Sequence, residues 1–173
     1  MDGRRHVVLV GLMGSGKTSI GSRLAARLGL RYVDNDETLW HRTGRTARQL
    51  AACDGIDRVH AEEAAALLDA LARPDPSVIG AAASVVESAR VREALGEHIV
   101  VWLDRDVALL AAKLRRKEHR PYPERDPLEL LREQRARRAP LYREVADVVV
   151  DPGERSKDDV AALIATEIAR LVQ

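Results

Sequence analysis

A glycine-rich segment from Gly11 to Thr18 constrains this sequence more than any other feature. It reads Gly-Leu-Met-Gly-Ser-Gly-Lys-Thr, which fits the pattern G-x-x-x-x-G-K-[ST]. The apolar run Val7–Val10 precedes it, and from Thr18 to Leu28 apolar residues recur with the period of a helix. A strand, a glycine-rich turn and a helix in this order predict a loop whose backbone amides surround a phosphate group.

The residue types in this loop indicate which ligands it takes. Glycines let several N–H groups point inward, and the helix N-terminus adds partial positive charge. In such a loop Lys17 reaches the β- and γ-phosphates, and the Thr18 hydroxyl is a ligand for Mg²⁺. We therefore predict ATP and Mg²⁺ as cofactors, bound by the loop residues Gly11, Met13, Gly14, Ser15, Gly16, Lys17, Thr18 and Ser19. The motif does not distinguish a kinase from a switch protein, but the N-K-x-D motif with which GTPase switch proteins read their base is absent.

Short β-branched runs alternate with long Ala-, Leu- and Arg-rich stretches along the rest of the chain. Continuous apolar strands separated by helices predict a parallel sheet with helices on both faces. We expect strands at residues 7–10, 31–33, 78–79, 99–103 and 148–150, and helices at residues 18–28, 36–43, 46–52, 61–72, 87–95, 107–117, 128–142 and 160–171. The prediction is an α/β fold forming a single domain over residues 1–173, with no interdomain linker.

Composition argues against several functional classes. The 28 Lys and Arg nearly balance 27 Asp and Glu, so the net charge of +1 gives no reason to expect nucleic acid or a membrane surface as a partner. Aromatic residues make up 3%, too few for a base-stacking platform. A single cysteine excludes an internal disulfide, and neither a membrane-spanning stretch nor a signal peptide is recognisable. We expect a cytoplasmic monomer or weak dimer whose partners are ATP and a small-molecule acceptor.

Two carboxylates follow the second expected strand. Residues two apart on an extended strand end point the same way, so Asp34 and Asp36 are expected to converge near the phosphate loop. One carboxylate could hold Mg²⁺ through water, and the other could orient or deprotonate an acceptor hydroxyl. The structural alternative is that Asp36 caps the helix that follows it.

Four motifs taken together resemble the shikimate kinase family. They are the phosphate loop, the Tyr-Val-Asp-Asn-Asp strand end, Thr43-Gly44-Arg45, and Arg138-Ala-Pro-Leu-Tyr142, and they occur in order over nearly the whole chain. The resemblance implies a P-loop fold of the nucleoside-monophosphate-kinase type, with three α/β/α layers and a five-stranded parallel sheet. It also implies an acceptor-binding region at about residues 36–72 and a helical lid at about residues 113–127.

The same resemblance implies roles for individual residues. Asp34 would lie near Mg²⁺, and Asp36 would bind the acceptor hydroxyl and act as the base. Arg120 matches the lid arginine that closes over the phosphates of ATP. Arg138 matches an arginine that holds a substrate carboxylate. The implied catalytic residues are Lys17, Asp36 and Arg120.

On the nucleotide side the resemblance points to two further segments. Lys113 falls near the adenine-stacking position, and the loop at residues 151–156, with Pro152, would flank the adenine. The window 113–143 holds eleven Lys or Arg against five Asp or Glu, which fits a lid that closes over phosphates. The alternative reading of that window is a solvated arginine-rich helix.

The acceptor side departs from the family pattern. The family's substrate helix, G-E-x-x-F-R-x-x-E, here reads Gly-Ile-Asp-Arg-Val-His-Ala-Glu-Glu, so His60 replaces an arginine that grips substrate. Ala82, Ala83 and Ser84 replace three glycines of a loop that approaches the substrate. Both changes predict altered acceptor specificity. The expected acceptor-binding residues are Asp36, His60, Ala82, Ala83 and Arg138.

These observations together predict an ATP-dependent phosphotransferase that passes the γ-phosphate to a hydroxyl of a small polar or anionic molecule, with shikimate among the candidates. Two alternatives remain open from the sequence. One is a nucleotide-binding regulatory or accessory protein without turnover, which the altered loop would explain. The other is a nucleoside or sugar kinase of the same fold.

Overall fold

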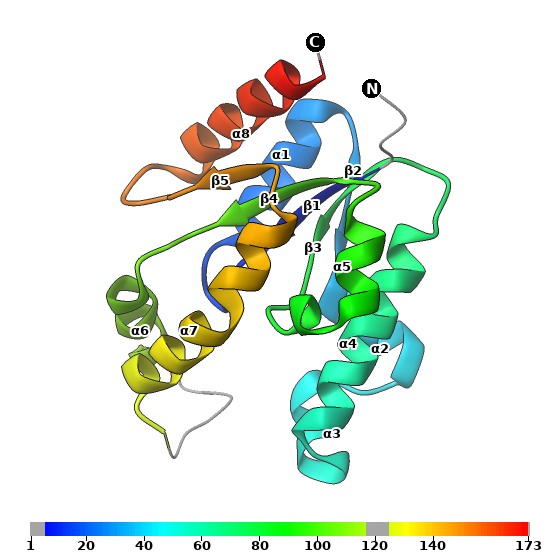
Figure 1. The fold of residues 1–173 in the computed structure, drawn as a ribbon, viewed down its shortest axis with the longest axis vertical. Coiled ribbons are helices and arrows are strands. Elements are labelled where there is room, and N and C mark those ends of the chain that lie inside the picture. Colours follow the sequence, from blue (N-terminus) through cyan, green and yellow to red (C-terminus); the bar gives the residue numbers. More distant parts are fainter. Residues whose placement is uncertain (1–5, 117–124, 173) are drawn as a thin grey trace.

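A five-stranded sheet forms the centre of the protein (Figure 1). The computed structural model describes residues 6–116 and 125–172. The strands are β1 (Val7–Val10), β2 (Arg31–Asp34), β3 (Ser77–Gly80), β4 (Ile99–Leu103) and β5 (Val148–Val150). They lie in the order β2-β3-β1-β4-β5, and every neighbouring pair is parallel. The predicted α/β fold with a five-stranded parallel sheet is therefore confirmed.

Helices connect the strands and cover both faces of the sheet. They are α1 (Lys17–Leu28), α2 (Asn35–Thr43), α3 (Ala47–Asp54), α4 (Ile56–Leu71), the short 3₁₀ helix η1 (Val85–Glu87), α5 (Ala89–Leu95), α6 (Val107–Arg115), α7 (Pro127–Val145) and α8 (Lys157–Leu171). None of these helices, which cover only the described part of the chain, is long and apolar enough to cross a membrane.

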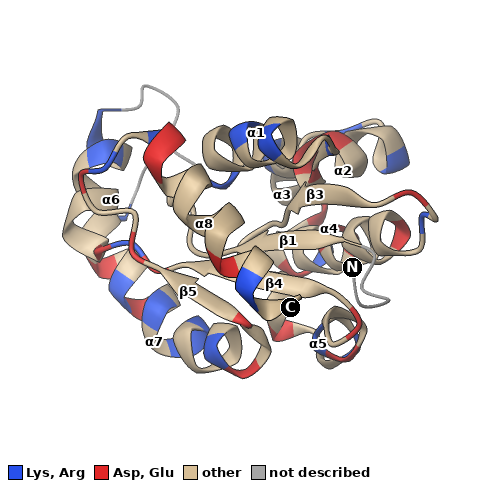
Figure 2. Cartoon of the chain, turned by 90° about the horizontal axis from the view of Figure 1, so that it is seen from above, with Lys and Arg blue, Asp and Glu red and all other residues tan. Residues whose placement is uncertain are grey.

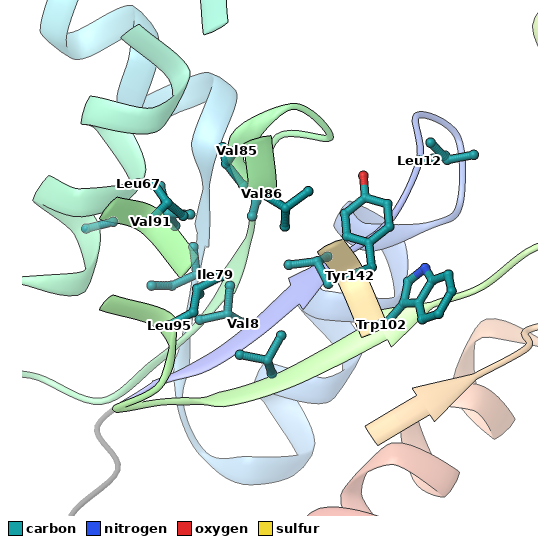
Figure 3. Packing of buried hydrophobic residues seen from close by; sticks show 14 of the residues in the cluster. Val8, Leu12, Leu67, Ile79, Val85, Val86, Val91, Leu95, Trp102 and Tyr142 are labelled. Atoms are coloured by element: carbon teal, nitrogen blue, oxygen red, sulfur yellow. The ribbon is translucent and has the colours of Figure 1, made fainter. Parts of the chain in front are cut away.

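Alternation along the strands divides the core into two layers. Val7 and Leu9 of β1 pack with α1 and α8 on one face. Val8 and Val10 face the other way, where α4, α5 and α7 cover the sheet. Figure 3 shows this second layer, in which Tyr142 of α7 lies beside Trp102 of β4 with ring centroids 5.7 Å apart. Successive strand residues are buried on opposite faces, as expected for a parallel sheet covered on both sides.

Several helices begin at residues other than those predicted, and two of these differences change where residues of the site lie. Helix α4 begins at Ile56 and not at residue 61, because Gly55, with φ of 83°, joins it directly to the end of α3. Glu87 belongs to η1 and precedes α5, because the Ser88 hydroxyl accepts a hydrogen bond from the Val91 amide and caps that helix. Consequently His60 lies in the first turns of α4, and Glu87 lies in the connection that follows β3.

The predicted lid at residues 113–127 falls mostly outside the described structure. Helix α6 ends at Arg115, and α7 begins at Pro127 with Asp126 as its N-cap. Arg120, predicted to close over the phosphates, lies in the segment 117–124, outside the described residues.

The packing of α8 on the sheet makes a testable prediction. Ile164 is fully buried in the core layer that contains α1, whereas its neighbour Leu163 is 37% exposed on the same helix. We expect Ile164→Ala to lower the free energy of unfolding by about 2–5 kcal/mol, because the lost methyl groups leave a cavity. Leu163→Ala is the matched control and should change it by less than about 1 kcal/mol. Urea unfolding followed by circular dichroism measures both, and equal losses would contradict this placement of α8.

Candidate active site

The glycine-rich loop that follows β1 has the backbone its sequence predicts. Gly11, Gly14 and Gly16 adopt positive φ angles of 144°, 82° and 107°. A Cβ atom added at Gly11 would lie 2.7 Å from the carbonyl oxygen of Leu103, so only glycine fits there. These three positions require glycine because L side chains rarely adopt such φ angles.

Lys17 lies over this loop. Its Nζ donates hydrogen bonds to the carbonyl oxygens of Gly11, at 2.7 Å, and Leu12, at 3.0 Å. Burial lowers the pKa of Lys17 to about 8, although the charges of Asp36 and Asp34 act to raise it. The lysine of the motif is therefore a partly buried cation that contacts the phosphate loop and interacts electrostatically with the two carboxylates after β2.

Two other residues predicted to bind nucleotide lie on α6 and in the connection from β5 to α8. The Lys113 ammonium donates to the Gly14 carbonyl, at 3.2 Å, which brings α6 to the loop. Pro152 is buried in the connection from β5 to α8, which ends at Lys157. Burial and the positive charges of Arg105, Lys113 and Arg23 lower the pKa of Lys157, so cations from α1, α6 and α8 gather on this side.

The remaining predicted loop residues contact the loop or the core. The Ser19 hydroxyl donates to the Gly16 carbonyl, at 3.3 Å. Met13 is partly buried against the core layer of α4 and α7. The Ser15 side chain is buried, and its hydroxyl has no hydrogen-bond partner among the described residues.

Asp34 ends β2 beside the phosphate loop. Its Oδ2 accepts hydrogen bonds from the hydroxyl of Thr18, at 3.1 Å, and from the hydroxyl of Tyr32, at 3.2 Å. Its Oδ1 accepts the backbone amide of Asp36, at 2.9 Å, and caps α2. Asp34 therefore joins the helix that carries the phosphate loop to the helix that carries Asp36.

The structure corrects two expectations about Asp36. The cap of α2 is Asp34 and not Asp36, since α2 begins at Asn35. For the same reason Asp36 does not extend the strand, and it reaches the site from the first turn of a helix. Burial and the charge of Asp34 raise the pKa of Asp36, while the charge of Lys17 opposes this shift. The structural alternative of a purely capping Asp36 is thus excluded by the cap that is present.

On the acceptor side, α4 meets the loop that follows β3. The Ser84 hydroxyl donates a hydrogen bond to the Glu63 carboxylate. Burial raises the pKa of Glu63, against the hydrogen bond from Ser84 and the charges of Arg138 and Lys17. Every non-glycine residue of the described chain, including Ala82 and Ala83, has negative φ, so this loop runs in a conformation that alanine tolerates.

Helix α7 supplies Arg138 to the same region. The side chain of Arg138 is 4% exposed, and its Nε donates to Oε1 of Glu87, at 2.6 Å. Arg137 donates to the same oxygen at 3.0 Å but is half exposed. One turn further along α7, the Tyr142 hydroxyl donates to the Ala83 carbonyl, at 2.6 Å.

His60 lies within electrostatic reach of this ion pair. Burial lowers the pKa of His60, and the charge of Arg138 lowers it further, so the imidazole is neutral at pH 7. Arg58, two residues earlier, pairs with Glu62 at 2.7 Å, and its side chain is 60% exposed. Arg58 therefore does not supply the charge that an arginine at position 60 would bring.

Acidic partners also accompany other basic residues of α7. Figure 2 shows basic positions along the helix with acidic positions between them. Arg135 pairs with Asp104 near the end of β4 and lies over the Trp102 ring. The arginine-rich window is therefore not a uniformly free basic surface over its described part.

Four residues of this site were absent from the predicted set: Tyr32, Glu63, Ser84 and Glu87. Glu63 closes the substrate-helix motif, so the sequence did contain a signal for it. Tyr32 is separated by one residue from Asp34 and shares its face of the strand, which is a weaker signal. Nothing local marks Glu87, whose partner lies 51 residues away.

Comparisons with known proteins show the family of the chain. The family model for shikimate kinase matches residues 13–169. A shikimate kinase from Symbiobacterium thermophilum is 37% identical over 167 residues, covering 94% of this chain and 95% of the relative. A shikimate kinase from Alteromonas mediterranea is 32% identical over 169 residues, covering 97% of this chain and 99% of the relative.

Solved structures give the same result. A shikimate kinase from Acinetobacter baumannii in complex with shikimate superposes with a TM-score of 0.89 at 30% identity, over 96% of this chain and 94% of that one. A gluconokinase from Sinorhizobium meliloti shares the fold, with a TM-score of 0.67 at 21% identity, over 99% of this chain and 95% of that one. With its phosphate loop, its carboxylates after β2 and these relatives, the chain belongs to the shikimate kinase family and is an ATP-dependent small-molecule kinase.

Proposed function

We propose that this kinase passes the γ-phosphate of ATP to a hydroxyl of a small polyhydroxy molecule bound between α2, α4 and α7. The observation that carries the proposal is the setting of Lys17. Its charge interacts with Asp34 and Asp36 of the β2 end and also with Glu63 and Arg138 of the acceptor side. These interactions support a single site that joins the phosphate loop to the expected acceptor residues.

On the nucleotide side, the proposed contacts use the loop amides and three cations. The amides of the loop and the N-terminus of α1 hold the triphosphate, and Lys17 neutralises its charge. Lys113, which contacts the loop at Gly14, and the segment around Pro152 flank the nucleotide on the α6 and α8 side. The resemblance assigns Arg120 to the phosphates as well.

The residues next to the loop fit a bound Mg²⁺. Thr18 and Asp34 present a hydroxyl and a carboxylate within 3.1 Å of each other, and hard oxygen donors of this kind suit Mg²⁺, which keeps several waters. The described residues contain no cluster of three His, Cys, Asp or Glu side chains around a metal position, which matches a cation held largely by phosphate and water. When bound, Mg²⁺ neutralises charge on the phosphates.

Asp36 is the proposed base and orients the acceptor hydroxyl. Its raised pKa makes it a better proton acceptor than an ordinary aspartate. In a loose phosphoryl-transfer transition state, the main contribution of such a group is to position the nucleophile. His60, Ala82, Ala83 and Arg138 are proposed to line the acceptor on its other sides.

An acceptor panel tests this function directly. ADP release would be measured with shikimate, quinate, gluconate, cyclitols and nucleosides. Shikimate belongs in the panel because the relatives are named for it. ADP release dependent on one of these acceptors supports the proposal, whereas ATP binding without release on any of them would favour an accessory protein.

Removing Lys17 should abolish turnover. We expect Lys17→Ala to lower kcat at least about 100-fold, because the transition-state charge loses a preorganised cation. Arg170→Ala is the control, since Arg170 is a cation 68% exposed near the end of α8. Initial rates and thermal unfolding of both variants provide the measurement. Near-wild-type activity of a folded Lys17→Ala variant would contradict the assignment.

Replacing Asp36 should separate phosphate transfer from nucleotide binding. We expect Asp36→Asn to reduce kcat by about 100-fold or more while the Kd for ATP changes little, because the loss is confined to the acceptor hydroxyl. Asp34→Asn should instead weaken Mg²⁺-dependent ATP binding and the cap of α2. Rates and calorimetric ATP binding distinguish them, and equal losses of both quantities in Asp36→Asn would count against its role as base.

A further inference from the structure

The strongest unexplained feature of the acceptor side is the ion pair between Arg138 and Glu87. Among the arginines that form ion pairs in the described chain, Arg138 has the most buried side chain, which is 4% exposed. The side chain of Glu87 is 28% exposed. The pair joins α7 to the end of η1, and Arg137 approaches the same carboxylate oxygen from the outside. Nothing in the proposed phosphate transfer requires a carboxylate at this position.

Glu87 keeps its charge at neutral pH. Burial acts to raise the pKa of Glu87, but the hydrogen bond from Arg138 and the charges of Arg138 and Arg137 outweigh it and lower the pKa. A carboxylate of the protein therefore already accepts the Nε–H of Arg138 and offsets the charge that would attract a carboxylate of a ligand. An anionic ligand would therefore meet an arginine whose charge is already offset, and the negative charge of Glu87 beside it would repel the ligand.

The described residues nearest to this pair do not restore the positive charge. His60 is neutral at pH 7, because burial and the charge of Arg138 lower its pKa. Arg137 is half exposed and already pairs with Glu87, so solvent screens its charge. Glu63 interacts electrostatically with both Arg138 and Asp36, so two further carboxylates lie near enough to repel an anion.

We propose that Glu87 is a specificity-determining residue that neutralises Arg138 and selects an uncharged polyhydroxy acceptor over one that carries a carboxylate. Carboxylate oxygens accept hydrogen bonds from hydroxyl groups, so Glu63, Asp36 and the outer oxygen of Glu87 form an acceptor-rich wall for a polyol. This inference rests on the proposed kinase function and narrows its acceptor class.

A matched pair of acceptors tests the proposal. Shikimate and its methyl ester carry the same ring and hydroxyls, and only shikimate is charged. The wild-type kinase should show a higher kcat/KM for the ester. Glu87→Gln keeps the shape and one acceptor oxygen but releases the charge of Arg138. We expect it to raise the ratio of kcat/KM for shikimate to that for the ester by about 10- to 100-fold.

Two further variants show whether the effect passes through Arg138. Glu87→Gln combined with Arg138→Gln should return the ratio to near the wild-type value, because the released charge is gone. Glu144→Gln is the matched control. Glu144 is a glutamate of α7 that pairs with Arg92 at 3.2 Å and is 56% exposed, so its replacement should leave the ratio unchanged.

Calorimetric binding of both probes without ATP separates this proposal from the kinase function. If Glu87→Gln binds shikimate more tightly than the wild type, the result supports the role of Glu87, whether or not either probe is phosphorylated. A lack of phosphorylation of both probes would count against the kinase function and not against the role of Glu87. A wild type that prefers shikimate, an unchanged ratio in folded Glu87→Gln, or no shikimate binding by that variant would overturn it. If thermal denaturation shows that the Glu87→Gln variant does not fold, the preference of the wild type between shikimate and its methyl ester decides whether the proposal holds.

Discussion

The parallel pairing of β3 with both β1 and β2 is the constraint on which the site depends. Gly80, the last residue of β3, lies opposite Leu9 of β1 and Asp34 of β2. The connections that leave these three strands are therefore held at one edge of the sheet, where ligands of open parallel sheets bind. They supply the phosphate loop, the carboxylates of Asp34 and Asp36, and the acceptor loop. A displaced register in either pairing would separate these groups.

Tyr32 illustrates how closely this edge is packed. Its ring fills the space beside two glycines, since a Cβ atom at Gly80 would lie 2.1 Å from its hydroxyl oxygen and one at Gly21 would lie 2.5 Å from its ring. The hydroxyl then reaches Asp34. The orientation of the carboxylate is thereby coupled to the packing of α1 against β3, and small residues at positions 21 and 80 are needed for it.

Sequence reasoning was most successful where neighbouring residues determine the geometry. The strands and the glycine-rich loop depend on local pattern and on φ angles that only glycine adopts readily, so their positions followed from the sequence. The helix start at Ile56 did not, because a single glycine can end one helix and begin another without a visible break in composition. The capping of α2 by Asp34 was also missed, since two aspartates lie within reach of the same amides.

Contacts between distant segments were beyond such reasoning. Glu63 and Ser84 are 21 residues apart, and Glu87 and Arg138 are 51 apart, so no periodicity connects them. The resemblance assigns roles to residues that match the family's motifs in sequence position. Sequence position alone does not show which residue pairs with a charged side chain in the fold. Arg138 is present as the resemblance requires, but its guanidinium is already paired.

The pairing also gives Arg138 a structural function that its position alone would not indicate. Arg138 and Tyr142 lie four residues apart on α7, and they contact Glu87 and the Ala83 carbonyl at the two ends of one connection. Residues at this spacing share a helix face, so both contacts fasten α7 to the loop that follows β3. A buried arginine without a carboxylate partner would be strongly destabilising, so in this fold Arg138 and Glu87 are best understood as one unit. The electrostatic character of the acceptor side and the attachment of α7 therefore have a common origin.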